Sequence, residues 1–84
     1  MVNEQQLIDM LQKESSRNAA FSIIVKQYTE QLYWQIRKIV LSHDDANDVL
    51  QNTFIKVFTN IENFRGDSKL LTWLYKIATN ESIT

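Results

Sequence analysis

The sequence contains no cysteine, no proline and a single glycine, Gly66, in 84 residues. Without cysteine the chain can form neither a disulfide framework nor a thiolate metal site or nucleophile, and this absence fits a reducing, intracellular compartment. Sheet proteins need turn residues about every ten positions, and a chain with almost no glycine or proline lacks them. These absences predict an all-α fold.

Long apolar runs and an excess of one charge are absent as well. No window reaches the roughly 18 to 20 apolar residues of a membrane span, and the opening MVNEQQLIDML does not have the pattern of a signal peptide. The formal net charge is −1, so any binding of nucleic acid must rest on a local patch. We therefore expect a cytoplasmic protein that does not insert into a membrane.

Apolar residues at helical spacing predict a compact domain of three to four helices over residues 1–84. The predicted helices span Glu4–Lys13, Arg17–Leu41, Asp44–Asn60 and a last segment after Gly66, where a positive φ is expected. Their start signals are Asn3 with Gln6 in the capping-box position, Ser15 or Ser16, Ser42, and Asp67 or Ser68. The chain ends in NESIT without a helix stop, so we expect a fragment of a longer protein.

The predicted helix Asp44–Asn60 has more apolar residues than one packed face requires. Its core stripe comprises Ala46, Val49, Leu50, Thr53, Val57 and Ile61, with Phe54 and Phe58 at the margin. Ile55 points nearly opposite this stripe, on a second face with Asp48, Gln51 and Asn52. Phe54 and Phe58 also fit a core, and single exposed apolar residues are common. The mixed second face nevertheless suggests a binding partner.

The following loop and last helix bring aromatic, cationic and amide side chains together. These side chains are Phe64, Arg65, Lys69, Thr72, Trp73, Lys76 and Asn80. Such a surface suits single-stranded nucleic acid, because bases stack on rings, amides read base edges and lysines meet phosphates. In the alternative interpretation Trp73 belongs to the core and the lysines form an ordinary solvated face.

Catalysis and metal binding have little support in this sequence. The only histidine, His43, has no second ligand nearby, and we expect it to be a solvated residue of a turn. The hydroxyl residues lack a histidine partner, and a glycine-rich phosphate loop is absent. We therefore expect a binding domain and not an enzyme, with no cofactor and no metal.

The stretch from Asp44 to Asn80 resembles the second conserved region of bacterial sigma factors, specifically of the extracytoplasmic-function (ECF) group. The matching pieces are Asp48-Val49-Leu50-Gln51, Phe64-Arg65-Gly66, and Thr72-Trp73-Leu74-Tyr75-Lys76-Ile77-Ala78 followed by Asn80. Each piece alone is unspecific, whereas their order and spacing are specific. The long second helix also agrees, so the resemblance covers nearly the whole chain.

This resemblance implies a transcription initiation domain that docks on the RNA polymerase core and recognises and helps melt the promoter element nearest the start site. The residues implied for docking on the clamp helices of the polymerase β′ subunit are Asp48, Gln51, Asn52, Ile55 and Phe58. The promoter DNA would be bound mainly as single-stranded, non-template strand, with one flipped base in a pocket of the loop Asn63–Lys69. The implied DNA-binding residues are Asn63, Phe64, Arg65, Lys69, Thr72, Trp73, Lys76 and Asn80.

Two departures and two alternatives accompany the resemblance. Asn52 stands where the family usually has an acid, and Thr79 stands where it often has arginine. The family's C-terminal helix-turn-helix domain has no counterpart in the sequence, so weak DNA binding is expected without polymerase. An anti-sigma factor is a further partner that the resemblance allows.

The alternatives are a helical interaction domain that dimerises through Phe54, Ile55 and Phe58, and, more remotely, a helical domain associated with a hydrolase.

Overall fold

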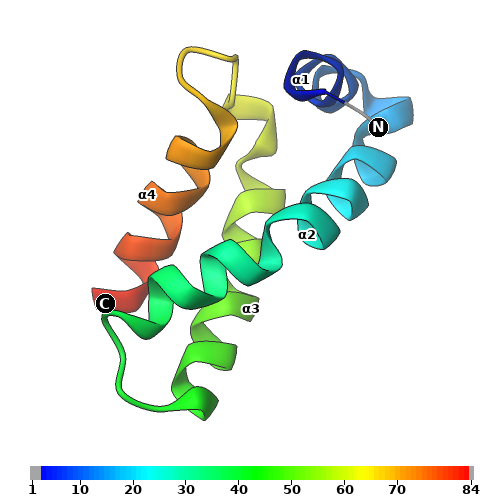
Figure 1. The fold of residues 1–84 in the computed structure, drawn as a ribbon. Coiled ribbons are helices and arrows are strands. Elements are labelled where there is room, and N and C mark those ends of the chain that lie inside the picture. Colours follow the sequence, from blue (N-terminus) through cyan, green and yellow to red (C-terminus); the bar gives the residue numbers. More distant parts are fainter. Residues whose placement is uncertain (1–2, 84) are drawn as a thin grey trace.

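The computed structural model describes residues 3–83 of the protein (Figure 1). Its α-helices are α1 (Glu4–Gln12), α2 (Glu14–Arg37), α3 (His43–Thr59) and α4 (Leu70–Ile83), and a short 3₁₀-helix, η1 (Ile61–Asn63), follows α3. Residues 3–83 contain no strand. The predicted all-α fold of three to four helices is therefore confirmed.

The longest helix, α2, organises the fold because α1, α3 and α4 all contact it. In Figure 1 it runs diagonally past α3 and α4, and α1 lies across its N-terminal end. The helices α3 and α4 also contact each other. The buried stripe of α2 consists of Ala20, Ile24, Tyr28, Leu32 and Ile36. Each four-residue step exceeds a full turn by about 40°, so this stripe winds around the helix and α2 meets different neighbours along its length.

Every helix contributes fully buried side chains to one shared core. Examples are Leu7 of α1, Leu32 of α2, Val57 of α3 and Leu74 of α4. Burial of one such side chain contributes about 1.5–3 kcal/mol, so the core holds the helices in fixed relative positions. The one buried polar residue among those described, Thr53, donates its hydroxyl to the Val49 carbonyl at 2.7 Å and leaves no unsatisfied group.

Two of the predicted helix starts are confirmed in detail. Asn3 Oδ1 accepts the Gln6 N–H at 2.8 Å, and Gln6 Oε1 accepts the Asn3 N–H at 2.9 Å, which completes the capping box. Ser42 Oγ accepts the Asp45 N–H at 3.0 Å. The first turn of α3 carries Asp44 and Asp45, where the helix dipole favours negative charge.

The predicted ends of the second helix were wrong. It begins at Glu14, so Ser15 and Ser16 lie inside the helix and do not cap it; the Ser16 hydroxyl instead donates to the Met10 carbonyl at 2.8 Å. The helix ends at Arg37 and not at Leu41. The Arg37 guanidinium donates to carbonyls beyond the helix, including that of Leu41 at 2.9 Å. This side-chain bond stabilises a turn where sequence periodicity predicted helix.

The start of α4 also differs from the prediction. The helix begins at Leu70, and the Lys69 carbonyl accepts the Trp73 N–H at 3.2 Å. Lys69 therefore holds the cap position, beyond the predicted Asp67 or Ser68. Gly66 has a φ of 80°, in the left-handed region that favours glycine, as predicted. Among residues 3–83, none of the helices combines the length and apolar character needed to cross a membrane.

Candidate functional site

The second face predicted on α3 is exposed to solvent. All five residues of the predicted docking set are exposed: Asp48, Gln51, Asn52, Ile55 and Phe58. The Ile55 side chain is 60% exposed and that of Phe58 is 43% exposed, whereas Thr53 and Val57 of the same helix are fully buried. The helix thus separates a core stripe from an exposed face that includes two large apolar side chains.

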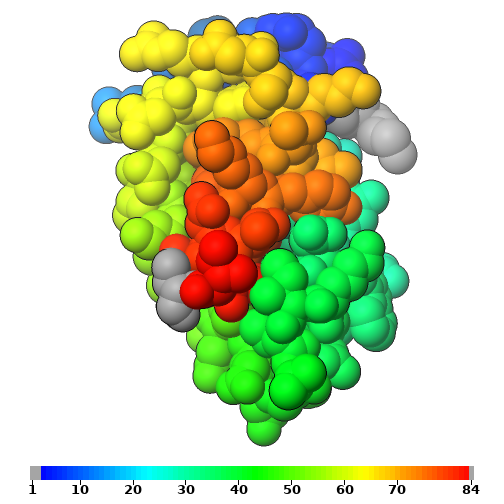
Figure 2. Space-filling model, turned by 90° about the vertical axis from the view of Figure 1, so that its left-hand side faces the viewer, coloured from blue at the N-terminus to red at the C-terminus, as the bar shows by residue number. Residues whose placement is uncertain are grey.

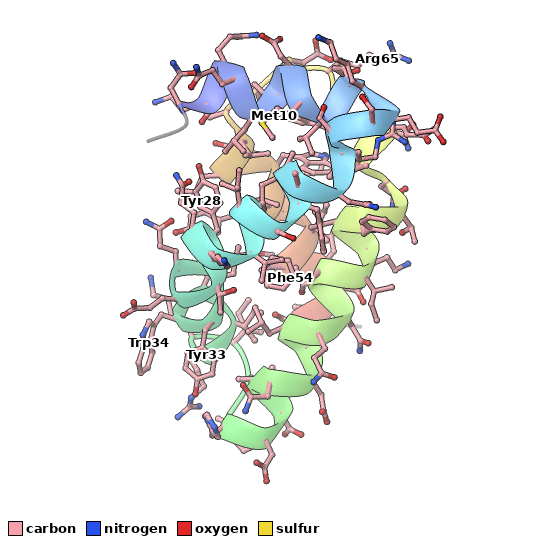
Figure 3. All side chains as sticks on the ribbon, turned by 90° about the vertical axis from the view of Figure 1, so that its right-hand side faces the viewer. Met10, Tyr28, Tyr33, Trp34, Phe54 and Arg65 are labelled. Atoms are coloured by element: carbon pink, nitrogen blue, oxygen red, sulfur yellow. The ribbon has the colours of Figure 1, made fainter. Side chains whose placement is uncertain are left out.

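An apolar groove of about 500 Å³ lies between α2 and α3. It is lined by Phe21, Val25, Gln51, Phe54, Ile55, Phe58 and Thr59. The Phe21 ring contacts the rings of Phe54 and Phe58 edge-on, with centroids 6.2 and 5.0 Å apart. Figure 3 shows Phe54 pointing from α3 toward α2. The apolar residues of α3 therefore belong to a groove shared by two helices, which we call the apolar groove.

Sequence reasoning did not single out Phe21 and Val25 as lining residues. Both are half-buried on α2, at the edge of its buried stripe. The periodicity of one helix shows which of its faces is apolar, but it does not show which helix lies beside that face. The sequence did show an excess of apolar residues on both helices. These residues form a groove only because α2 packs on α3.

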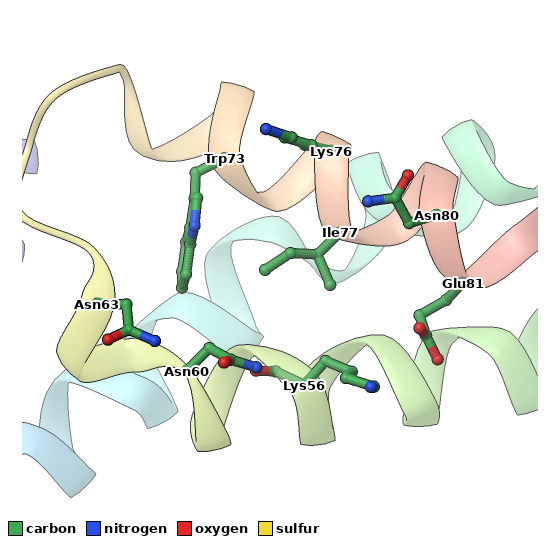
Figure 4. A pocket seen from close by; sticks show the side chains of 8 residues that line it. All are labelled: Lys56, Asn60, Asn63, Trp73, Lys76, Ile77, Asn80 and Glu81. Atoms are coloured by element: carbon green, nitrogen blue, oxygen red, sulfur yellow. The ribbon is translucent and has the colours of Figure 1, made fainter.

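A second groove, of about 340 Å³, lies between the C-terminal part of α3 and α4 (Figure 4). It is lined by Lys56, Asn60, Asn63, Trp73, Lys76, Ile77, Asn80 and Glu81. In Figure 4 the Trp73 ring points from α4 toward Asn60 and Asn63. Figure 2 shows the face of the molecule on which α4 lies, with α3 beside it and the loop above it. We call this the polar groove.

The polar groove brings together four of the predicted DNA-binding residues. They are Asn63, Trp73, Lys76 and Asn80. Sequence reasoning missed Lys56 of α3 and the following cap residue Asn60, which line the same groove. The Asn60 Nδ2 donates to the Lys56 carbonyl at 2.8 Å, which fixes the orientation of the amide. Two lysines, three amides and one indole ring thus surround a hollow in which the carboxylate of Glu81 also lies.

The other four predicted DNA-binding residues lie outside the polar groove. They are Phe64, Arg65, Lys69 and Thr72, and all except Phe64 are exposed. Figure 3 shows Arg65 at the edge of the molecule, extending away from its body. The loop that carries Arg65 and Lys69 lies above α4 in Figure 2. Both cations are exposed in this loop.

Phe64 requires a correction, because its side chain is only 3% exposed. Its ring lies 4.9 Å from the Trp73 ring, at an interplanar angle of 34°. A bound strand cannot reach it directly, so Phe64 supports Trp73 instead. Trp73 itself is half-buried, packs against the core and also lines the polar groove. The two interpretations of Trp73, as a core residue and as a binding residue, are therefore compatible.

Two other titratable side chains, those of His43 and Tyr28, have defined surroundings. His43 is exposed in the first turn of α3, with Nδ1 2.5 Å from the Tyr33 hydroxyl and Nε2 3.0 Å from Asn47 Nδ2. Within residues 3–83, no group of three His, Cys, Asp or Glu side chains could hold a metal ion. Burial, and secondarily the negative charge of Glu4, raise the pKa of Tyr28. Tyr28 lines neither groove.

Comparison with known proteins identifies the family. Residues 24–84 match the model of sigma-70 region 2. The RNA polymerase sigma-H factor of Pseudomonas aeruginosa is 40% identical over 77 residues, which cover 92% of this chain and 39% of that protein. The ECF RNA polymerase sigma-E factor of Haemophilus influenzae is 37% identical over 79 residues, 94% of this chain and 40% of that protein. The chain therefore spans about two fifths of the length of these relatives.

A solved structure has the same fold. It is the NMR structure of an engineered region 2 of sigmaE in complex with GTAAAA, and it superposes with a TM-score of 0.84 at 31% identity. The similarity covers 96% of this chain and 82% of that chain. The chain therefore belongs to the sigma-70 region 2 family, and its relatives place it with the extracytoplasmic-function sigma factors.

Proposed function

We propose that this domain docks on the RNA polymerase core and holds the melted promoter element nearest the start site. The observation that carries this proposal is the polar groove, which combines Trp73 with Lys56, Lys76 and Asn80. The similar region 2 of sigmaE was solved in complex with GTAAAA, so a short strand is the natural occupant to propose. The domain then contributes to transcription initiation by binding, without catalysis.

The chemistry of the polar groove suits a single strand. The exposed ammonium groups of Lys56 and Lys76 can meet phosphates, and the Trp73 ring offers a surface for a base to stack on. Each stacked base contributes about 1–3 kcal/mol. The amide of Asn80 can donate to a base edge and accept from it, which a lysine cannot do. The groove thus offers lysines for the phosphates, the Trp73 ring for the face of a base and the Asn80 amide for its edge.

We assign a flipped base to the loop Asn63–Lys69, next to the polar groove. Extruding a base from a duplex costs a few kcal/mol, and a preformed pocket offsets that cost best because little protein must be ordered on binding. The left-handed turn at Gly66 and the packing of Phe64 on Trp73 support such preorganisation. Arg65 and Lys69 are exposed in the loop and would meet the adjoining phosphates.

We assign the clamp helices of the polymerase β′ subunit to the apolar groove. Ile55 and Phe58 supply exposed apolar anchors, and Asp48, Gln51 and Asn52 supply exposed polar groups around them. An apolar centre with a polar rim is typical of protein interfaces, and grooves between helices commonly receive an amphipathic helix. Such a partner would position the polar groove on the melted strand. The cytoplasm, where polymerase acts, is the corresponding location, and an anti-sigma factor that competes for the same face is a compatible further partner.

A fluorescence titration tests the strand assignment. The chain has two tryptophans, so a Trp34→Phe variant reports Trp73 alone; Trp34 is exposed and lines neither groove. We expect the hexamer GTAAAA to change the Trp73 emission in a manner that weakens with added salt, because lysine–phosphate contacts release counterions. No change in emission at low salt, even at high strand concentration, would contradict the assignment.

The homodimer alternative rests on the exposure of Ile55 and Phe58 in the apolar groove. In that case the apolar groove would receive a second copy of the chain in place of polymerase. Sedimentation of the free domain over a concentration series distinguishes the two. The docking proposal predicts a monomer that binds a β′ clamp-helix fragment, whereas the alternative predicts a dimer that does not.

A further inference from the structure

The loop assigned to the flipped base is held by a part of the chain that precedes the matched family region. The family model begins at residue 24, so α1 and the first turns of α2 lie outside it. Residues 64–69 belong to no helix, so their position depends on what the side chains around them contact. Two bonds from α1 and α2 reach the segment that contains this loop, and one apolar side chain of α1 lies beside it.

The first contact joins the end of α1 to the start of the loop. Gln12, the last residue of α1, donates from Nε2 to the Phe64 carbonyl at 2.5 Å. The Phe64 ring in turn packs on Trp73, which lines the polar groove. A single amide therefore fixes the peptide that leads from Phe64 into the exposed part of the loop.

The second contact joins α2 to η1, immediately before the loop. Arg17 Nη1 and Glu62 Oε1 lie 2.9 Å apart, and Arg17 Nε donates to the Leu11 carbonyl at 3.1 Å. The Arg17 side chain is 20% exposed and that of Glu62 is 72% exposed. Exposed ion pairs of this kind add little to global stability. The Arg17 side chain instead fixes how α1, α2 and η1 lie relative to one another.

Ile8 of α1 lies beside the left-handed turn. A Cβ placed on Gly66 would be 3.7 Å from Ile8 Cγ2 and 3.8 Å from Ile8 Cδ1. The Ile8 side chain of α1 is buried, so it forms an apolar support for the turn. Two bonds thus reach residues 62 and 64, which flank Asn63 of the polar groove, and Ile8 lies beside residue 66.

We propose that Gln12 and Arg17 are positioning residues that set the geometry of the loop Asn63–Lys69 and hence the choice of base. They act through Phe64 and Glu62 and do not touch the strand. The effect on the choice of base rests on the proposed function, because it requires that the domain bind DNA. The positioning itself is a property of the free domain and is measured without DNA.

The experiment compares Gln12→Ala and Arg17→Glu with the parent chain, all in the Trp34→Phe background. Amide NMR signals of residues 63–69 and the Trp73 indole signal report loop position. Affinities for GTAAAA and for AAAATG, which has the same bases in reversed order, report discrimination. Binding of the β′ clamp-helix fragment shows whether the apolar groove is unchanged in these variants. Gln5→Ala is the matched control, because Gln5 lies exposed on the same helix and its side chain bonds to Asp9, away from the loop.

We expect both variants to shift the loop signals and to lower the preference for GTAAAA over AAAATG by about three- to tenfold, the effect of one net hydrogen bond. Clamp-fragment binding and the Gln5→Ala control should match the parent. The charge-exchanged pair Arg17→Glu with Glu62→Arg should restore the preference relative to Arg17→Glu alone. Such rescue would not follow from general destabilisation.

Two results would overturn the inference. Unchanged loop signals in Gln12→Ala and Arg17→Glu would refute positioning whatever the DNA data show. Shifted loop signals with an unchanged GTAAAA preference would refute the role in base choice. A parent chain that binds neither hexamer, but whose loop signals still move in the variants, would instead refute the proposed function and leave the positioning contacts established.

Discussion

The two grooves that flank α3 differ in chemistry although they share a helix. The apolar groove is lined mainly by Phe21, Val25, Phe54, Ile55 and Phe58. The polar groove is lined mainly by lysines, amides and Trp73; α3 supplies Lys56 to it, and Asn60 follows at the cap of this helix. Two residues at 100° each place Phe54 of the apolar groove and Lys56 of the polar groove about 160° apart around the helix. One helix therefore presents two separate binding surfaces on either side of its buried stripe.

Because the two grooves have separate linings, the two proposed partners can be separated by mutation. Within residues 3–83, none lines both grooves. A change in a side chain that lines one groove should mainly affect the partner bound there, apart from Thr59 and Asn60, whose side chains bond to each other across the two linings. Variants that affect both partners equally should be those that alter α3 itself or the core beneath it.

The largest effect is expected from a charge placed in the apolar groove. Ile55→Asp should weaken binding of the β′ clamp-helix fragment by about thirtyfold or more, because truncating a central apolar anchor costs roughly 2 kcal/mol and an unpaired buried charge adds to that. Affinity for GTAAAA should stay at the parent value. Isothermal titration with each ligand checks both statements.

Gln31→Asp is the matched control for this variant, because Gln31 is exposed on α2 and lines neither groove. Its clamp-fragment affinity should equal that of the parent chain. If Ile55→Asp binds the fragment as tightly as the control does, the apolar groove is not the docking surface.

The next effect is expected in the polar groove. The double change Lys56→Ala with Lys76→Ala should weaken GTAAAA binding by about tenfold at low salt. It should also flatten the dependence of log affinity on log salt by about 0.7 for each phosphate that a lysine no longer neutralises. Clamp-fragment binding should remain unchanged. A fluorescence titration at several salt concentrations measures both quantities.

Lys26→Ala serves as the control for charge alone, since Lys26 is exposed on α2 outside both grooves. Its salt slope should match the parent. An equal slope for the double variant and for Lys26→Ala would mean that the lysines of the polar groove do not contact phosphates.

A smaller effect is expected from the cap of α3, the helix common to both grooves. Ser42→Ala removes the bond to the Asp45 N–H and should lower the free energy of unfolding by about 1 kcal/mol. Thermal or urea denaturation measures this decrease. Both ligands should bind with parent affinity while the domain is folded. Weaker binding of only one ligand would show that the grooves are not equally coupled to α3.

The smallest effect is expected at Tyr28, in the dependence of the free energy of unfolding on pH. Burial and Glu4 raise the pKa of Tyr28 above its usual 10.0 in the folded state. The folded chain therefore retains the Tyr28 proton where the unfolded chain begins to release it. The contribution of this residue to stability is complete below pH 10 and falls as the pH rises above it. Tyr28→Phe should lose less stability than the parent between about pH 9 and pH 11, measured by urea denaturation; equal losses would contradict the assignment.

Much of the fold follows from sequence because it depends on single helices. The spacing of Ala46, Thr53 and Val57 predicted the buried stripe of α3, and the same helical geometry predicted that Ile55 is exposed. The capping chemistry of Asn3 and Ser42 predicted two helix starts within a residue. These features are local, so local patterns suffice to predict them.

The features that sequence reasoning missed arise from contacts between elements. Phe21 and Lys56 each line a groove only because another helix lies beside them. The burial of Phe64 depends on its packing against Trp73, and the end of α2 at Arg37 depends on bonds to the turn beyond it. Tertiary contacts of this kind override helix periodicity, which describes one element at a time.

Simultaneous binding of the clamp-helix fragment and GTAAAA tests whether the two grooves are separate binding surfaces. The domain is saturated with the β′ clamp-helix fragment and then titrated with GTAAAA, with Trp73 fluorescence in the Trp34→Phe chain as the signal. If the two grooves bind separately, we expect a complex of one domain, one fragment and one strand, with a strand affinity within about twofold of that of the free domain. Displacement of the fragment by the strand, or abolished strand binding in the saturated domain, would contradict it.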